Sequence, residues 1–123
     1  MGKQINARHK GHNLERQIRL EFIEMGWKDC QTSRYGSKEM DDALCDLIHT
    51  DPFNLQCKAW EHAPSYHDIL SEMPQNENIN IIIHKRNRKG EVVVMKKEDF
   101  YRILKLLGLP RHQPTKPQAA KRT

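Results

Sequence analysis

The apolar segments of this chain are short and separated by polar turns, and this limits what it can fold into. Only 37% of its 123 residues are hydrophobic, whereas 30% are charged. The longest apolar stretches, such as Ile81 to Ile83, fall far below the ~18–20 residues that cross a bilayer, so we expect no membrane span. The length fits one domain with a thin core, and we expect a second copy of the chain to help cover it.

Apolar spacing predicts helices and strands around one central sheet. Leu14, Ile18, Phe22 and Met25 recur at helical intervals, which predicts a helix from about His12 that Gly26 ends. Alternating or continuous apolar runs bounded by turn residues predict strands. We therefore expect an α+β (α/β) fold, a central mixed sheet flanked by helices, in the order αβββαββα. The expected elements after the first helix are strands 27–32, 44–49 and 55–60, helix 65–73, strands 79–84 and 91–95, and a last helix from about Glu98 to Leu107.

The two ends of the chain differ in composition from its centre. Residues 1–10 are polar and basic without periodicity, and we interpret them as a flexible basic arm. Residues 110–123 contain four basic residues, no acid and several prolines, which predicts a disordered basic tail. A single domain over residues 11–109 lies between them.

Charge and cysteine content narrow the class of protein. The net charge of +5 and the pI of about 9.2 favour a polyanionic partner, of which nucleic acid is the first candidate. Cys30, Cys45 and Cys57 are odd in number and lack paired C-x-x-C spacing, so we expect reduced thiols in a cytoplasmic protein rather than disulfides or a zinc site.

Three polar residues of the second and third expected strands can converge. Gln56 and Lys58 are two positions apart on one strand, so their side chains should share a face. A hairpin that turns at Asp51 and Pro52 would bring Asp46 beside Gln56. Glu15 should project near the buried edge of the first helix.

This pattern resembles the PD-(D/E)XK, or restriction-endonuclease-like, nuclease superfamily, with Glu15 as its helical acid. In element order and size the chain is most similar to the archaeal and phage Holliday junction resolvases, which act as homodimers on branched DNA. Two positions depart from the motif, because Cys45 precedes the aspartate and Gln56 replaces the second acid. Either the Gln56 amide oxygen is a weaker ligand, or Glu15, Asp42 or Asp41 supplies the missing charge.

The resemblance implies an Mg²⁺- or Mn²⁺-dependent endodeoxyribonuclease of a prokaryotic, archaeal or phage-infected cytoplasm, active in DNA recombination and repair. Asp46, Gln56 and the Cys57 carbonyl would hold the metal, and Lys58 would position water or stabilise the phosphate in the transition state. The alternatives are a nuclease of this fold acting on linear or single-stranded DNA, a catalytically weakened DNA-binding module, and an unrelated RNA-binding domain. We expect these residues to contact DNA: Arg34, Ser37, Lys38, Lys85, Arg86, Arg88 and Lys89.

Overall fold

The computed structural model describes residues 2–33, 38–39 and 44–111, with side chains from residue 9 onwards. Over this part of the chain it has three helices and five strands, and their order is the predicted αβββαββα. The elements are α1 (Gly2–Met25), β1 (Gln31–Thr32), β2 (Leu47–Ile48), β3 (Phe53–Lys58), α4 (Tyr66–Glu72), β4 (Ile79–Arg86), β5 (Gly90–Val94) and α5 (Lys97–Leu106).

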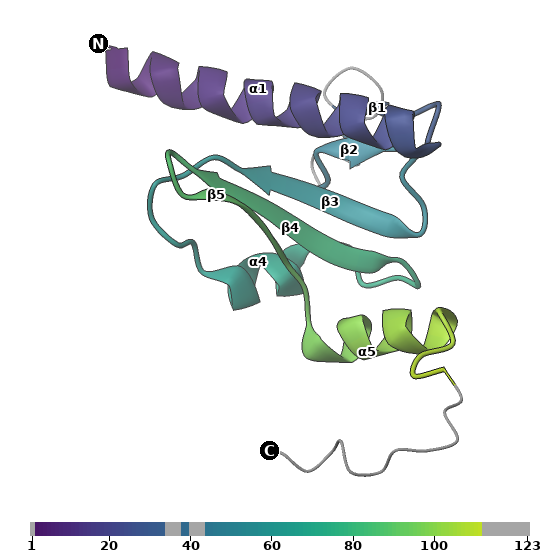
Figure 1. Ribbon diagram of the computed structural model, residues 1–123. Coiled ribbons are helices and arrows are strands. Elements are labelled where there is room, and N and C mark those ends of the chain that lie inside the picture. The colour runs from purple at the N-terminus through teal and green to yellow at the C-terminus, as the bar shows by residue number, and fades with distance from the viewer. Residues whose placement is uncertain (1, 34–37, 40–43, 112–123) are drawn as a thin grey trace.

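The five strands form one open sheet in the order β1-β2-β3-β4-β5 (Figure 1). The pairing of β3 with β4 is parallel and the other three pairings are antiparallel, so the sheet is mixed as expected. Helix α4 lies on the connection between the two parallel strands, as such a crossover requires. Figure 1 shows α1 on one side of the sheet and α4 on the other. None of the described helices is long and apolar enough to cross a membrane.

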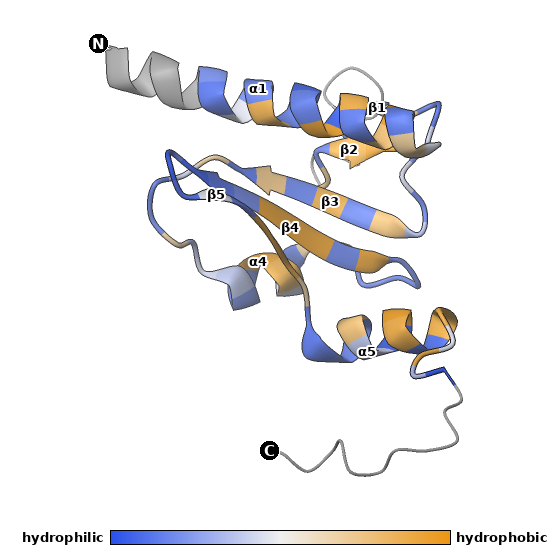
Figure 2. Cartoon of the chain, in the orientation of Figure 1, coloured by the Kyte–Doolittle hydropathy of each residue, from blue (hydrophilic) through white to orange (hydrophobic). Residues whose placement is uncertain are grey.

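Two apolar layers hold these elements together. On one face, Leu14 and Ile18 of α1 pack against Leu55 and Cys57 of β3 and alternate isoleucines of β4. On the other face, Leu70 and Met73 pack against Ile82. Each large aliphatic side chain buried in this way contributes roughly 1.5–3 kcal/mol relative to exposure. The hydrophobic residues of β3 and β4 form the centre of the molecule in Figure 2.

Helix α1 begins ten residues earlier than expected. It starts at Gly2, so the expected flexible arm over residues 1–10 forms the helix instead, apart from Met1, which lies outside the described residues. Apolar periodicity located the part of the helix from Leu14 onwards, where the described side chains contact the core. The polar half reaches past the sheet, where the Lys10 ammonium lies 3.6 Å from the Glu61 carboxylate.

Helix α5 is less buried than its apolar stripe predicted. Ile103 and Leu104 are half-buried, but Phe100 is 48% exposed and Leu107 is 61% exposed. The helix follows an edge strand, and α1 and α4 already lie on the two sides of the sheet (Figure 1). Its apolar side therefore stays largely open. The expected basic tail lies outside the described residues beyond Arg111.

Candidate active site

The hairpin of β2 and β3 brings Asp46 beside the Gln56-Cys57-Lys58 segment. Leu47 is the register partner of Leu55, and the Asp46 N–H donates to the Leu55 carbonyl at 2.7 Å. The next free donor of β3, the Cys57 N–H, donates to Asp46 Oδ2 at 2.7 Å. The aspartate carboxylate thus replaces a backbone carbonyl as the acceptor where the ladder ends. This hydrogen bond fixes the carboxylate at the backbone of Cys57.

Gln56 and Lys58 lie on the α4 face of the sheet. They are the register partners of Ile82 and His84, which contact α4 residues. Their neighbours Leu55 and Cys57 lie in the layer beneath α1. Because neighbouring strand residues alternate between faces, the predicted shared face of Gln56 and Lys58 is confirmed.

Glu15 lies on the other face. It is a half-buried residue of α1, next to Leu14 in the layer that contains Cys57. The structure therefore brings Asp46, Gln56 and Lys58 to one strand pair, but it does not bring Glu15 to the face of Gln56 and Lys58. The backbone of Cys57 and the carboxylate of Asp46 lie between the two sides.

The Gln56 side chain has an unsatisfied oxygen. The residue is 6% exposed, and Oε1 is buried without a hydrogen-bond partner among the described residues. Such an atom costs roughly 1–3 kcal/mol if nothing binds it. An amide oxygen, a carboxylate and a strand carbonyl are hard oxygen donors of the kind that Mg²⁺ and Mn²⁺ accept. The orphaned atom therefore fits a cation or its bound water.

Few acidic side chains of the described residues lie near Asp46 and Gln56. Among the described residues, no three His, Cys, Asp or Glu side chains gather in a way that could hold a metal ion. Asp42 and Asp41, which could supply a further acid, lie outside the described residues. Within the described part of the chain, oxygen ligands around Asp46 would have to include the Gln56 amide and backbone carbonyls.

The thiols beside the site are buried and protonated. Burial raises the pKa of the Cys57 thiol well above its ordinary value, and the Asp46 and Glu15 carboxylates raise it further. Burial also raises the pKa of Cys45 to about 11, with Asp46 again contributing. The two carboxylates therefore give the Cys57 environment a negative potential, which favours a cation there. Neither thiol is set up to act as a nucleophile.

Residues that follow Lys58 complete its surroundings and were not predicted from the sequence. The Lys58 ammonium lies 4.4 Å from the centre of the Trp60 ring. The Trp60 carbonyl accepts from Nε2 of His84 at 2.7 Å, and Nδ1 of His84 lies 2.7 Å from the Tyr66 hydroxyl. The contact between Lys58 and Trp60 could have been predicted from their spacing. A tryptophan two residues after the candidate lysine can reach its side chain, and His62 follows at the same interval.

The basic residues of the β4–β5 turn lie at the same end of the sheet as Lys58. Because β3 and β4 are parallel and Lys58 pairs with His84, the strands end together. Lys85 is half-buried, and Arg86, Arg88 and Lys89 are exposed just beyond it. Lys38 is also exposed, whereas Arg34 and Ser37 lie outside the described residues.

Comparisons with protein-family models, with curated proteins and with solved structures found no match to this chain. The chemistry open to the site follows from its donor atoms. These are the carboxylate of Asp46, the buried amide oxygen of Gln56 and the ammonium group of Lys58 at the end of β3. Carboxylate and amide oxygens are ligands for a hard cation, and an ammonium group can bind a phosphate.

Proposed function

We propose that this chain is a metal-dependent DNA endonuclease of the restriction-endonuclease-like fold, with its active site at Asp46, Gln56 and Lys58. The observation that carries the proposal is the hydrogen bond from the Cys57 N–H to Asp46 Oδ2 at 2.7 Å. It joins the carboxylate to the centre of the Gln56-Cys57-Lys58 segment, which is where the resemblance to the nuclease motif requires an acid.

Asp46, the Gln56 amide oxygen and the Cys57 carbonyl would hold Mg²⁺ or Mn²⁺. The bound ion would polarise the scissile phosphate and lower the pKa of a coordinated water. In a strand, the N–H and C=O of one residue point to the same edge, so the Cys57 carbonyl faces the side on which its N–H meets Asp46. The orphaned Gln56 oxygen supports its place in this set.

Lys58 would act on the phosphate itself. Its side chain lies on the same face as Gln56, and its ammonium lies 4.4 Å from the centre of the Trp60 ring. The ammonium can therefore donate to a phosphate oxygen and stabilise the charge that develops during hydrolysis. A preorganised donor of this kind contributes about 3–4 kcal/mol to the transition state.

DNA is the substrate that the surrounding charge favours. The ends of β3 and β4 place Lys58 beside the basic residues of the β4–β5 turn, Lys85, Arg86, Arg88 and Lys89. Sequence-independent contacts with phosphates depend on such distributed charges. Branched DNA, including the Holliday junction, is the substrate we propose.

A homodimer would cover the apolar surface that the monomer leaves open. Val92 and Val93 are 51% and 57% exposed on β5, which is an edge strand of the sheet. Phe100 and Leu106 are exposed apolar residues of α5. A two-fold axis pairs the same surface patch with itself and would place two active sites on a branched substrate. We propose that β5 and α5 form the dimer interface.

A DNA-binding module that does not cleave is the second candidate. It is favoured by the lack of any group of three potential metal ligands within the described residues. Calorimetric titration with Mn²⁺ separates the two candidates. A nuclease should bind the ion in wild type and lose it in Asp46→Asn, whereas a non-cleaving module should show no binding in either protein.

Cleavage of a panel of end-labelled DNA substrates tests the proposal. The panel holds a four-way junction, a linear duplex of the same sequence, and its single strands, each incubated with Mg²⁺, with Mn²⁺ and with EDTA. The proposal expects cleavage of the junction that requires the divalent ion. Cleavage of linear or single-stranded DNA alone would support nuclease activity but contradict the proposed branched substrate. Binding without cleavage would support the second candidate, the DNA-binding module.

A further inference from the structure

A stacked pair of aromatic rings lies directly after Lys58. The rings of Trp60 and His62 are 5.4 Å apart at an interplanar angle of 21°. Trp60 is 41% exposed and His62 is also exposed. The Lys58 ammonium lies 4.4 Å from the Trp60 ring centre. Exposed rings beside an ammonium group match the chemistry of a nucleotide, which presents a flat base next to a phosphate.

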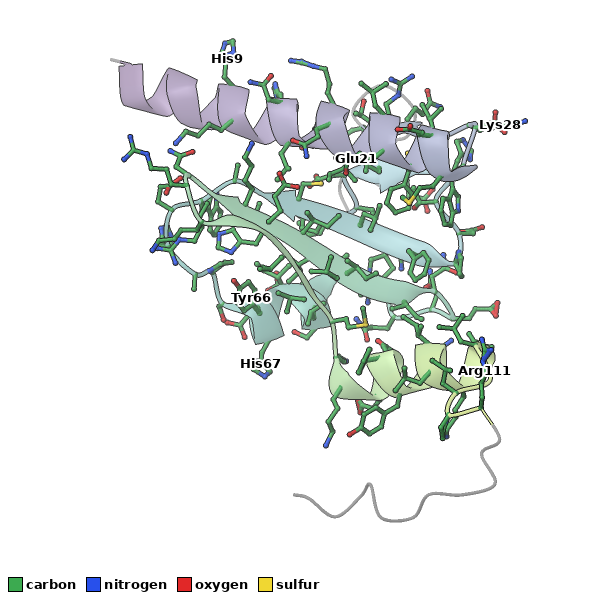
Figure 3. All side chains as sticks on the ribbon, in the orientation of Figure 1. His9, Glu21, Lys28, Tyr66, His67 and Arg111 are labelled. Carbon is green, nitrogen blue, oxygen red and sulfur yellow. The ribbon has the colours of Figure 1, made fainter. Side chains whose placement is uncertain are left out.

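A buried polar chain holds this pair in place. His84 is 2% exposed, and its Nε2 lies 2.7 Å from the Trp60 carbonyl. Since a carbonyl only accepts, Nε2 carries a proton, and Nδ1 on the other side of the ring lies 2.7 Å from the Tyr66 hydroxyl. Tyr66 comes from α4 and lies toward the sheet, whereas the neighbouring His67 points away from it (Figure 3). The anchored backbone reduces the conformational entropy that a ligand must remove when it stacks.

The charge around the pair also suits a nucleotide. Lys85 and Arg86 follow His84 on β4. The nearby acid, Glu61, is held by the Lys10 ammonium at 3.6 Å and accepts from the Asn87 N–H at 3.1 Å. Its charge is therefore already compensated, and the cations remain to meet phosphates.

We propose that the Trp60–His62 pair binds an unpaired nucleobase of DNA, which stacks on the exposed ring surface while its phosphate lies near Lys58 and Lys85. The bases of a continuous duplex are stacked on one another and cannot reach the rings unless they are extruded. The pair therefore selects DNA with unpaired bases, such as a bulge or an open branch point. This inference rests on the proposed nuclease for its DNA substrate, but the stacking itself needs no metal ion.

Fluorescence of Trp60 tests the stacking in EDTA. The chain has two tryptophans, so Trp27→Phe leaves Trp60 as the reporter. The probes are a DNA duplex with a short bulge and the same duplex without it. We expect saturable quenching with the bulged duplex and little change with the paired one. No change with either probe, or equal quenching by both, would overturn the proposal.

Binding by variants gives an independent test with labelled versions of the same probes. Trp60→Leu should weaken binding of the bulged duplex about tenfold without affecting the paired duplex, and Trp60→Phe should retain most of the affinity. His67→Leu is the control, because His67 is an exposed ring-bearing residue of α4, outside the proposed stacking pair and the proposed dimer interface. It should change neither affinity.

The outcomes separate this inference from the nuclease proposal. Unchanged affinity in Trp60→Leu with intact cleavage would overturn base stacking alone. A Trp60-dependent preference for the bulge without any cleavage would keep base stacking and count against the nuclease. If Trp60→Leu does not fold by circular dichroism, His62→Ala replaces it, since His62 is exposed. The variant should then weaken bulge binding severalfold, and an unchanged affinity would overturn the inference.

Discussion

At the scale of single residues, the candidate site depends on how Gln56 and Asp46 are satisfied. Asp46 Oδ2 has the Cys57 N–H, whereas Gln56 Oε1 is buried without a described partner. The neutral amide can be buried at modest cost, but a carboxylate in its place would need a compensating cation. The difference between the two side chains therefore offers a direct probe for a metal ion.

The variant Gln56→Glu should be destabilised without metal and stabilised by it. An uncompensated buried carboxylate should cost at least about 2 kcal/mol and lower the melting temperature. Addition of Mn²⁺ should then raise the melting temperature more than it does in wild type. Thermal unfolding with and without Mn²⁺ measures this, with Gln31→Glu on exposed β1 as the matched control. Equal metal shifts in all three proteins would contradict the placement of Gln56 at a metal.

Cys45 should make stability depend on alkaline pH. Burial and Asp46 raise the pKa of its thiol from 9.0 to about 11. Between these values the unfolded thiol loses its proton while the folded one keeps it, so stability is full below pH 9 and falls as pH rises. The slope per thiol is at most about 1.4 kcal/mol per pH unit. Urea unfolding at pH 8 and pH 10 should show a smaller loss in Cys45→Ala, and an identical loss would argue against this burial.

At the scale of elements, local patterns predicted the order of the secondary structure but not its limits. The alternation on β3 correctly placed Gln56 and Lys58 on one face. It could not place Glu15 relative to them, because the face that α1 covers is set by tertiary packing. The first strand is confined to Gln31–Thr32 since Trp27 instead packs on Phe22, at 4.8 Å between ring centres.

The ends of the two terminal helices illustrate the same limit. Sequence periodicity reports burial, and among the α1 side chains that the structure describes the core contacts begin at Leu14. In α5 the periodicity was strong, but only Ile103 packs against the main core. An apolar pattern predicts that one face of a helix is apolar, but it does not predict which element packs against that face. We propose that the apolar face of α5 packs against a second copy of the chain.

Substitutions on β5 and α5 should therefore weaken self-association. Val92→Lys and Leu106→Asp place charges on the proposed interface, and each should raise the dimer dissociation constant at least about tenfold. Leu20→Asp is the matched control, because Leu20 is 59% exposed on α1. Sedimentation equilibrium checks the result. A monomeric wild type, or an equal effect of the α1 variant, would contradict the interface.

At the scale of the whole molecule, the parallel pairing of β3 and β4 gathers the charged groups at one end. Lys58 and the β4–β5 turn lie together because the two strands end in register. The net charge of +5 predicts a polyanionic partner, but it does not predict where the cations lie. Their position at the site follows from the topology of the sheet. Arg34, Ser37, Asp42 and the expected tail remain predictions outside the described residues.

The basic turn should control the salt dependence of DNA binding. Arg88→Ala and Lys89→Ala should each lower the slope of log affinity against log salt by about 0.9, the value for one lost phosphate contact on B-DNA. Fluorescence anisotropy across a salt series measures the slope. The exposed Lys28, which follows α1, supplies the control, since Lys28→Ala should leave the slope unchanged. Equal slopes in wild type and both turn variants would place the DNA elsewhere.

The rate of DNA cleavage in Asp46→Asn and Lys58→Ala tests the central claim most directly. Asparagine can still accept from the Cys57 N–H, so the hairpin should persist while the metal charge is lost. We predict that each variant cleaves at least about 100-fold more slowly with its DNA affinity within severalfold of wild type. Asp29→Asn and Lys28→Ala, at exposed positions, should retain the full rate. Wild-type rates in Asp46→Asn and Lys58→Ala would contradict this active site.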